Sequence, residues 1–137
     1  MRAMGLDVGS ATVGVALSDA LKMIASSYTV IRYEQENEEL FQQIVNIIKE
    51  KDVDEVVIGM PYHMNGDFSE GCKRSERFIE NILKLIDIKI IKIDERLSTV
   101  SANNALLQFD VSRKKRKQVV DKVAATVILQ TYLDRRK

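Results

Sequence analysis

The chain has few of the residues that staple or rigidify small proteins. Its 137 residues include one cysteine, one proline, one histidine and no tryptophan. A single cysteine, Cys72, excludes an internal disulfide. The single histidine, His63, has no cysteine or acidic neighbour at metal-ligand spacing, so we interpret it as a surface-loop residue.

Long apolar runs are also missing. No stretch approaches the roughly 18 apolar residues expected of a membrane span. The first four residues lead directly into strand-like sequence and do not resemble a signal peptide. We therefore expect a soluble, cytoplasmic protein, and the length suits one domain that covers residues 1–137.

The net charge of +1 hides an asymmetry along the chain. Residues 1–109 carry 12 basic and 17 acidic side chains, whereas residues 110–137 carry nine basic and three acidic ones. The densest basic stretch is a run of five residues: Arg113, Lys114, Lys115, Arg116 and Lys117. Such a run suggests a surface that meets a polyanion, although charge runs are most often solvated helix ends.

The hydrophobic pattern predicts an α/β fold. Two-residue alternation and β-branched runs indicate strands over residues 5–9, 13–19, 26–33, 53–59 and 88–93. Helical spacing indicates helices over residues 38–51, 70–87, 100–109 and 118–133. This order predicts a mixed five-stranded sheet, with three antiparallel strands followed by parallel additions, flanked by helices.

Three carboxylates occupy positions that a packed fold rarely gives to an acid. Asp7 lies inside the first strand, Glu95 follows the fifth, and Asp121 lies beside the apolar stripe of the last helix. If the first and fifth strands are near neighbours, Asp7 and Glu95 face one another, and Asp121 approaches from the helix. Three ionised carboxylates at one place require a cation, and Mg²⁺ prefers oxygen ligands. The alternative for Asp7 is a surface position on an edge strand.

Several sequence blocks, in this order, carry a resemblance to a known family: Gly5–Gly9, Val13–Asp19, Gly59–Pro61 with Met64–Gly66, Asp94–Thr99, Ser112–Lys117, and Asp121–Ala125 with Ile128–Gln130. Together they resemble the YqgF (RuvX-type) family over nearly the whole chain. The resemblance implies a ribonuclease-H-like fold. Members are described as Holliday junction resolvases and as nucleases that process the 5′ end of the small-subunit ribosomal RNA precursor.

The resemblance also implies roles for individual residues. Asp7, Glu95 and Asp121 would be catalytic acids that bind Mg²⁺, or Mn²⁺ in its place. Arg96, Ser98 and Thr99 would line the site near the substrate phosphate, and the run from Arg113 to Lys117 would bind nucleic acid. One departure concerns Thr12, where many members carry an arginine.

Four functions are compatible with these residues. The first is an Mg²⁺-dependent endonuclease that processes the ribosomal RNA precursor, and the second is a Holliday junction resolvase, which would require a two-fold dimer. The third is a non-catalytic nucleic-acid-binding module. The fourth is a relative of the actin-like ATPases, because Gly5–Ser10 resembles their first phosphate loop, although they need two such domains. The expected nucleic-acid partner is structured RNA or branched DNA, and the expected protein partners are ribosome-assembly or transcription factors. The protein could be a monomer or a homodimer.

Overall fold

The computed structural model describes residues 1–62, 69–94 and 113–135, and for residues 113–122 it describes the backbone alone. Five strands form one sheet: β1 (Arg2–Val8), β2 (Thr12–Ser18), β3 (Ala25–Arg32), β4 (Val53–Met60) and β5 (Lys89–Asp94). The spatial order is β3-β2-β1-β4-β5. The first three strands are antiparallel, and β4 and β5 join in parallel, which confirms the predicted mixed sheet.

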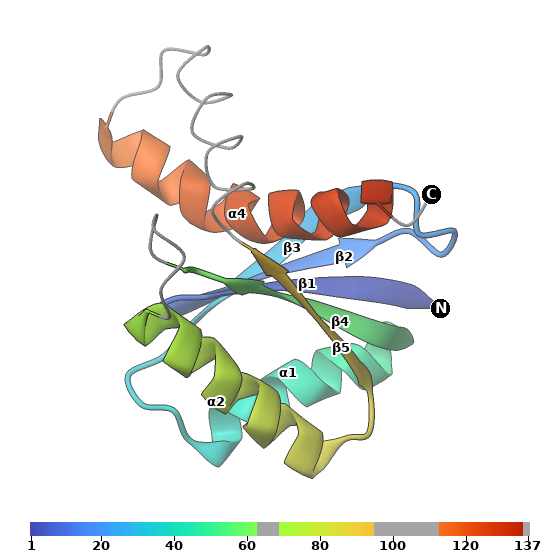
Figure 1. Cartoon of the computed structure of the whole chain (residues 1–137), viewed down its shortest axis with the longest axis horizontal. Coiled ribbons are helices and arrows are strands. Elements are labelled where there is room, and N and C mark those ends of the chain that lie inside the picture. The colour runs from blue at the N-terminus through green and yellow to red at the C-terminus, as the bar shows by residue number, and fades with distance from the viewer. Residues whose placement is uncertain (63–68, 95–112, 136–137) are drawn as a thin grey trace.

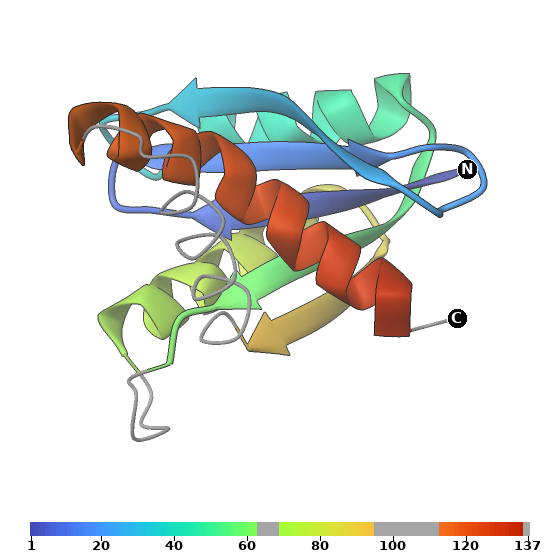
Figure 2. The same ribbon diagram turned by 90° about the horizontal axis from the view of Figure 1, so that it is seen from above.

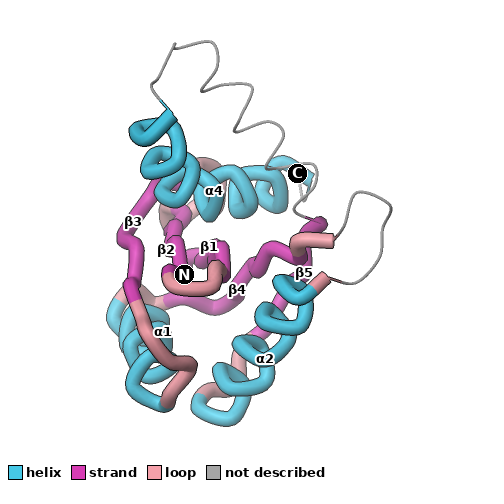
Figure 3. Tube along the Cα trace, turned by 90° about the vertical axis from the view of Figure 1, so that its left-hand side faces the viewer, coloured by secondary structure: helices cyan, strands magenta, loops and turns pink. Residues whose placement is uncertain are grey.

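Helices cover both faces of this sheet. The helices α1 (Glu38–Glu50) and α2 (Glu70–Leu85) lie on one face, and α4 (Arg113–Arg135) crosses the other (Figure 1). Figure 3 shows the strands as a layer between α4 and the α1–α2 pair. None of the helices in the described ranges combines the length and apolar composition needed to cross a membrane.

Local signals in the sequence fix where α1 and α2 begin. The side chain of Asn37 accepts a hydrogen bond from the backbone N–H of Leu40 at 3.1 Å. Ser69 accepts one from the N–H of Cys72 at the same distance. Each cap satisfies an N–H group that has no partner within the helix, and such caps typically stabilise a helix by about 1 kcal/mol.

The pleat of β1 divides its side chains between two cores. Met4, Leu6 and Val8 are buried with α1 and α2, where Phe78 packs edge-on against Phe41 with ring centroids 4.9 Å apart. The alternate residues of β1 face α4, whose core includes Ala3 together with Ala125, Ile128, Leu129 and Leu133. This alternation decides which residues of β1 share a face with Asp7.

Several element boundaries differ from the expectation, among them the start of β1, which is at Arg2, three residues earlier than predicted. Helix α4 begins at Arg113, five residues earlier than predicted, so the basic run belongs to the helix and does not precede it. Lysine and arginine are good helix formers, which explains why the run extends the helix. Helix α2 ends at Leu85, two residues early. The predicted helix over residues 100–109 and the loop with His63 lie outside the described residues.

Candidate functional site

The candidate site lies at the edge of the sheet where β1, β4 and β5 end. These strands are parallel, so their carboxyl ends meet at one edge. Asp7 lies near the end of β1, half-buried, on the α4 face, because its neighbours Leu6 and Val8 face the opposite core. Within the described part of the chain, the Asp7 carboxylate makes no hydrogen bond and no ion pair. A half-buried carboxylate without a partner is suited to hold a cation.

The neighbours of Asp7 in the sheet leave space around its carboxylate. Its antiparallel partner on β2 is Gly14. On β4, Leu6 is paired with Ile58, so the next position, level with Asp7, is Gly59. Neither neighbour has a side chain, so no side chain of β2 or β4 lies level with Asp7. A site for a metal ion or a phosphate group needs neighbours without side chains beside the carboxylate.

Helix α4 packs unusually close to β1 just before Asp7. A Cβ atom added to Gly5 would lie 2.7 Å from the carbonyl oxygen of Ala125 and 2.8 Å from the Cβ of Leu129. Only glycine permits this approach, since real Cβ contacts are longer. The absence of a side chain at Gly5 therefore sets how near α4 lies to the strand that carries Asp7.

The direction of α4 brings Asp121 to the level of Asp7. Near its carboxyl end, the hydroxyl of Tyr132 donates to the carboxylate of Glu55, at the start of β4, at 3.0 Å. The helix therefore runs antiparallel to β1 and β4. Asp121 lies one turn before Ala125, about 6 Å along the helix, and Asp7 lies about 7 Å beyond Gly5 along β1. The backbone positions of the two acids are thus level, at the same edge.

The other predicted site residues have different outcomes. Strand β4 separates β1 from β5, so the premise that these two strands are near neighbours is wrong; their axes are about 10 Å apart. The crossover through α2 puts β5 outside β4. Strand β5 brings the chain to the correct edge at Asp94, but Glu95 lies outside the described residues, as do Arg96, Ser98 and Thr99.

The basic run has a clear place in the fold. Residues 113–117 form the first turns of α4, which lie at the carboxyl end of β1 (Figure 2). Figure 2 also shows the opposite end of α4 near the N-terminus of the chain, in keeping with the antiparallel course. The basic segment and Asp7 therefore belong to the same end of the molecule.

The register reveals Arg32, a residue that the sequence did not single out. Arg32 at the end of β3 is paired with Thr12 on β2. Ile31 is buried against α1, so the pleat puts Arg32 on the face that carries Asp7. Arg32 is exposed and has no ion pair within 4.0 Å among the described residues. An arginine thus lies beside Thr12, and only the strand register could identify it.

A second residue that sequence reasoning missed is Tyr33, which holds the turn after β1. Its hydroxyl donates to the carbonyl of Gly9, and its backbone N–H donates to the carbonyl of Ala11 at 3.0 Å. Burial raises the pKa of Tyr33 and the charge of Glu36 adds to this, against the opposing effect of nearby arginines. The phenol therefore keeps its proton and remains a donor.

The far end of α4 is held by a charged cluster, the α4 latch, formed by Lys22, Asp54, Glu55 and Tyr132. The ammonium group of Lys22 lies 2.8 Å from Asp54 and 3.1 Å from Glu55, which is only 4% exposed. Burial alone would lower the pKa of Lys22, but its bonds to both acids outweigh burial and raise the pKa. Burial would likewise raise the pKa of Asp54, but Lys22 outweighs it and lowers the pKa.

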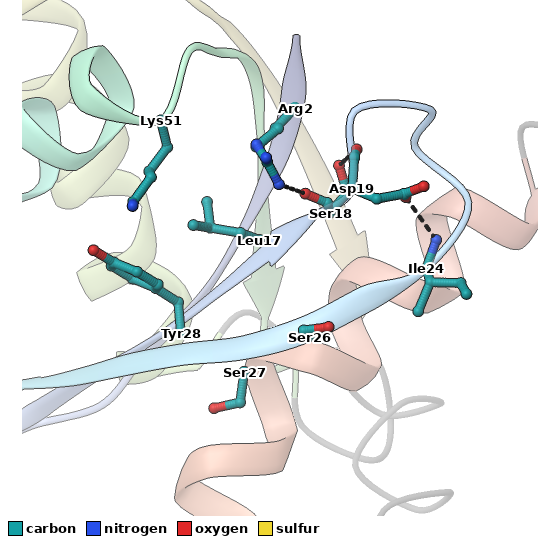
Figure 4. Close-up of a pocket in the computed structure, with 9 residues that line it drawn as sticks. All are labelled: Arg2, Leu17, Ser18, Asp19, Ile24, Ser26, Ser27, Tyr28 and Lys51. Carbon is teal, nitrogen blue, oxygen red and sulfur yellow. Dashed lines mark hydrogen bonds between the residues drawn. The ribbon is translucent and has the colours of Figure 1, made fainter.

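The described residues also enclose a pocket of about 470 Å³ at the opposite end of the sheet (Figure 4). There the guanidinium of Arg2 donates to the carbonyl of Ser18 at 3.1 Å. The ammonium of Lys51 lies 5.3 Å from the centre of the Tyr28 ring. Because Arg2 begins β1 and Asp7 is near its end, this pocket is separate from the Asp7 site and contains none of the predicted site residues.

Comparison with known proteins supports the resemblance found in the sequence. A family model described as RuvX, Holliday junction resolvase, matches residues 1–135. A protein of Bacillus cereus (strain AH187) named "Putative pre-16S rRNA nuclease" is 45% identical over 137 residues, which covers 99% of this chain and 100% of that protein. A protein of Bacillus anthracis (strain CDC 684 / NRRL 3495) with the same name is 45% identical over 135 residues, 98% of each chain.

Solved structures extend the comparison to the fold. Thermus thermophilus RuvC in complex with a Holliday junction substrate matches with a TM-score of 0.59 and 12% identity, over 99% of this chain and 95% of that one. The fowlpox virus Holliday junction resolvase matches with a TM-score of 0.57 and 13% identity, over 98% of this chain and 99% of that one. At these identities the likeness concerns the fold, which is ribonuclease-H-like. With a family model matched over residues 1–135 and relatives 45% identical along their length, the chain belongs to the RuvX family.

Proposed function

We propose that this protein is a nuclease that hydrolyses phosphodiester bonds at the 5′ end of the small-subunit ribosomal RNA precursor, with Mg²⁺ bound by Asp7, Glu95 and Asp121. The observation that carries this proposal is the close crossing of α4 over β1 at Gly5, from which we infer that Asp7 and the backbone of Asp121 lie at the same carboxyl edge of the sheet. The names of relatives at 45% identity support a ribosomal RNA precursor as the substrate.

The residues present suit a divalent metal ion. Carboxylate oxygens are the ligands that Mg²⁺ prefers, and the flanking glycines leave room for the waters and phosphate oxygens that Mg²⁺ commonly retains. The described residues supply no cationic side chain to neutralise Asp7, so its charge is available to the ion. When bound, Mg²⁺ would polarise the scissile phosphodiester and offset the negative charge that develops in the transition state.

The chain's own residues would then bind and orient the nucleic acid. Arg113–Lys117 would contact the phosphate backbone, with affinity that falls as salt rises and depends little on sequence. Arg32 would contact a phosphate from the side of β3, in place of the arginine that Thr12 replaces. The carboxylate of Asp7 would be one of the ligands of the ion, beside Gly14 and Gly59.

A Holliday junction is the second candidate substrate. The family description and the solved relatives support it, but the solved relatives are only 12–13% identical to this chain. A resolvase would make paired, symmetric incisions and would act as a two-fold dimer. The two substrates therefore differ in products as well as in the oligomeric state they require.

The test is cleavage of an end-labelled small-subunit rRNA precursor fragment and a four-way DNA junction, with Mg²⁺ or with chelator. Wild type, Asp7→Asn and a matched control, Asp87→Asn, are compared; Asp87 is an exposed acid beyond the end of α2. We expect Mg²⁺-dependent cleavage of the RNA by wild type and control, and none by Asp7→Asn with binding retained. Symmetric junction cleavage alone would favour the resolvase, and binding without any cleavage would refute the nuclease.

A further inference from the structure

We infer that Tyr33 is a positioning residue for this site: it holds the Gly9–Thr12 turn as a fixed rim beside Asp7. The inference rests on the proposed function, because it assigns the turn a place in binding and orienting the substrate phosphate. Within the described part of the chain, Tyr33 makes no hydrogen bond to Asp7 and acts through the backbone of the turn.

Tyr33 contacts the turn at two points. Its hydroxyl donates to the carbonyl of Gly9, and its backbone N–H donates to the carbonyl of Ala11 at 3.0 Å. Within the turn, the N–H of Gly9 donates to the carbonyl of Thr12 at 2.7 Å. The carbonyls of Gly9 and Ala11 are therefore both bonded to one residue from the end of β3, which restrains the turn from one side.

The held turn lies where substrate has to approach. It begins two residues after Asp7, at the carboxyl end of β1, and its central residues Ser10 and Ala11 are exposed. Their backbone N–H groups donate to no atom in the described part of the chain. Successive free amides in a turn form a favourable place for a phosphate oxygen, provided that the turn keeps its shape.

The support behind Tyr33 comes from the opposite core. Its ring lies 5.9 Å from that of Phe78, which is fully buried between α1 and α2. The linker after Tyr33 is tied to α2 by Glu36, which accepts two hydrogen bonds from the guanidinium of Arg77, at 3.0 and 2.8 Å. Tyr33 therefore connects the rim of the site to the packed α1–α2 layer.

The substitution Tyr33→Phe tests this role because it removes only the hydroxyl; the ring contact with Phe78 and the backbone N–H remain. The matched control is Tyr28→Phe, the same chemical change within β3, the strand that Tyr33 directly follows, at an exposed position away from the turn. Steady-state cleavage of the rRNA precursor gives kcat, KM and the Mg²⁺ concentration for half-maximal rate. Amide hydrogen exchange of Gly9 and Tyr33, whose N–H groups donate to the carbonyls of Thr12 and Ala11, reports the turn without reference to activity.

For Tyr33→Phe we expect kcat to fall about tenfold, with KM changed by no more than about twofold, because a positioning defect acts mainly in the transition state. The Mg²⁺ requirement should rise several-fold, and exchange at the hydrogen-bonded amides of Gly9 and Tyr33 should quicken about tenfold, while the strand amides keep their protection. Tyr28→Phe should match wild type in every measurement.

If Tyr33→Phe has the same kcat and the same amide exchange in the turn as wild type, the inference is overturned, while the assignment of Asp7 stays intact. Faster exchange throughout the sheet, with the loss of activity explained by unfolded protein, would also overturn it, since Tyr33 would then be only a stability residue. If wild type cleaves neither substrate, the proposed function fails. The role of Tyr33 is then tested by the affinity for Mn²⁺, measured by calorimetry. Equal Mn²⁺ affinity in Tyr33→Phe and wild type would overturn the inference as well.

Discussion

Adding one methyl group at Gly5 should move α4 away from the sheet. The new Cβ of Gly5→Ala would lie 2.7 Å from the Ala125 carbonyl and 2.8 Å from the Leu129 Cβ, whereas ordinary contacts begin at 3.4 Å. The helix must therefore retreat by about 0.7 Å, the difference between the two values. Both obstructing atoms belong to the backbone or its first side-chain carbon, so no flexible side-chain end can swing aside.

Overpacking of this kind costs about 1–3 kcal/mol of the free energy of unfolding. At about 4 °C per kcal/mol for a chain of this size, the Tm should fall by about 4–12 °C. Because α4 carries Asp121, the shift also changes its distance from Asp7, and misplacement by about 1 Å can reduce a rate by about 100-fold. We therefore expect Mg²⁺-dependent cleavage by folded Gly5→Ala to fall at least about tenfold.

The assay combines thermal unfolding with cleavage measured well below the Tm, where the variant is folded. Gly9→Ala is the comparison for stability, since the nearest atom to its Cβ would be the Thr12 carbonyl oxygen, at 3.1 Å, and a shift of a few tenths of an ångström relieves the contact. Its loss of stability should be under about 1 kcal/mol. Wild-type stability and activity in Gly5→Ala would refute the close packing of α4 on β1, and with it the level placement of Asp121 and Asp7.

Two further substitutions address the α4 latch and the β3 side of the site. Lys22→Met removes the nearer cation from the buried Glu55 carboxylate and leaves only the exposed Lys89, at 3.9 Å, among the described residues, so it should destabilise the protein by about 3 kcal/mol, measured by urea unfolding. Since the pKa of Lys22 is raised and that of Asp54 lowered, their stabilising effect is complete from about pH 5 to about pH 10. The deficit of Lys22→Met should therefore shrink as the pH falls through the lowered pKa of Asp54; a pH-independent deficit would contradict the assignment. Arg32→Ala should raise KM about threefold to tenfold with little change in kcat, and reduce the salt dependence of binding by about one charge. Arg135→Ala, at the far end of α4, is its control, and equal effects of both would argue against a specific phosphate contact by Arg32.

The sequence predicts the elements of this fold well because their signals are local. Alternation along β1 assigns Leu6 and Val8 to one face and Asp7 to the other, and the structure agrees. The cap at Asn37 is likewise visible in the sequence, since it depends on a residue three positions away. Those local patterns are also sufficient to expect a mixed sheet with helices on its faces.

Relations between distant residues could not be predicted in the same way. Alternation gives the face of a strand but not its neighbour, so nothing in the sequence showed that β4 lies between β1 and β5. Glu55 resembles an ordinary strand acid, and its burial makes sense only with Lys22 and with Tyr132, which is 77 residues away in the chain. The importance of Gly5 similarly depends on the crossing of α4.

The two ends of the sheet treat buried charge in opposite ways, and this contrast supports the location of the active site. At the start of β4, Glu55 is buried with an ammonium group and a phenol as partners, so its charge is compensated by the protein. At the end of β1, Asp7 is half-buried between two glycines, and the described residues give it no partner. A half-buried charge that the described residues leave without a partner costs stability within that part of the chain, and proteins tolerate such costs mainly where function requires them. Asp7→Asn should therefore be at least as stable as wild type without metal, whereas added Mg²⁺ should raise the Tm of wild type alone. Equal stabilisation of both proteins by Mg²⁺ would remove Asp7 from the metal site.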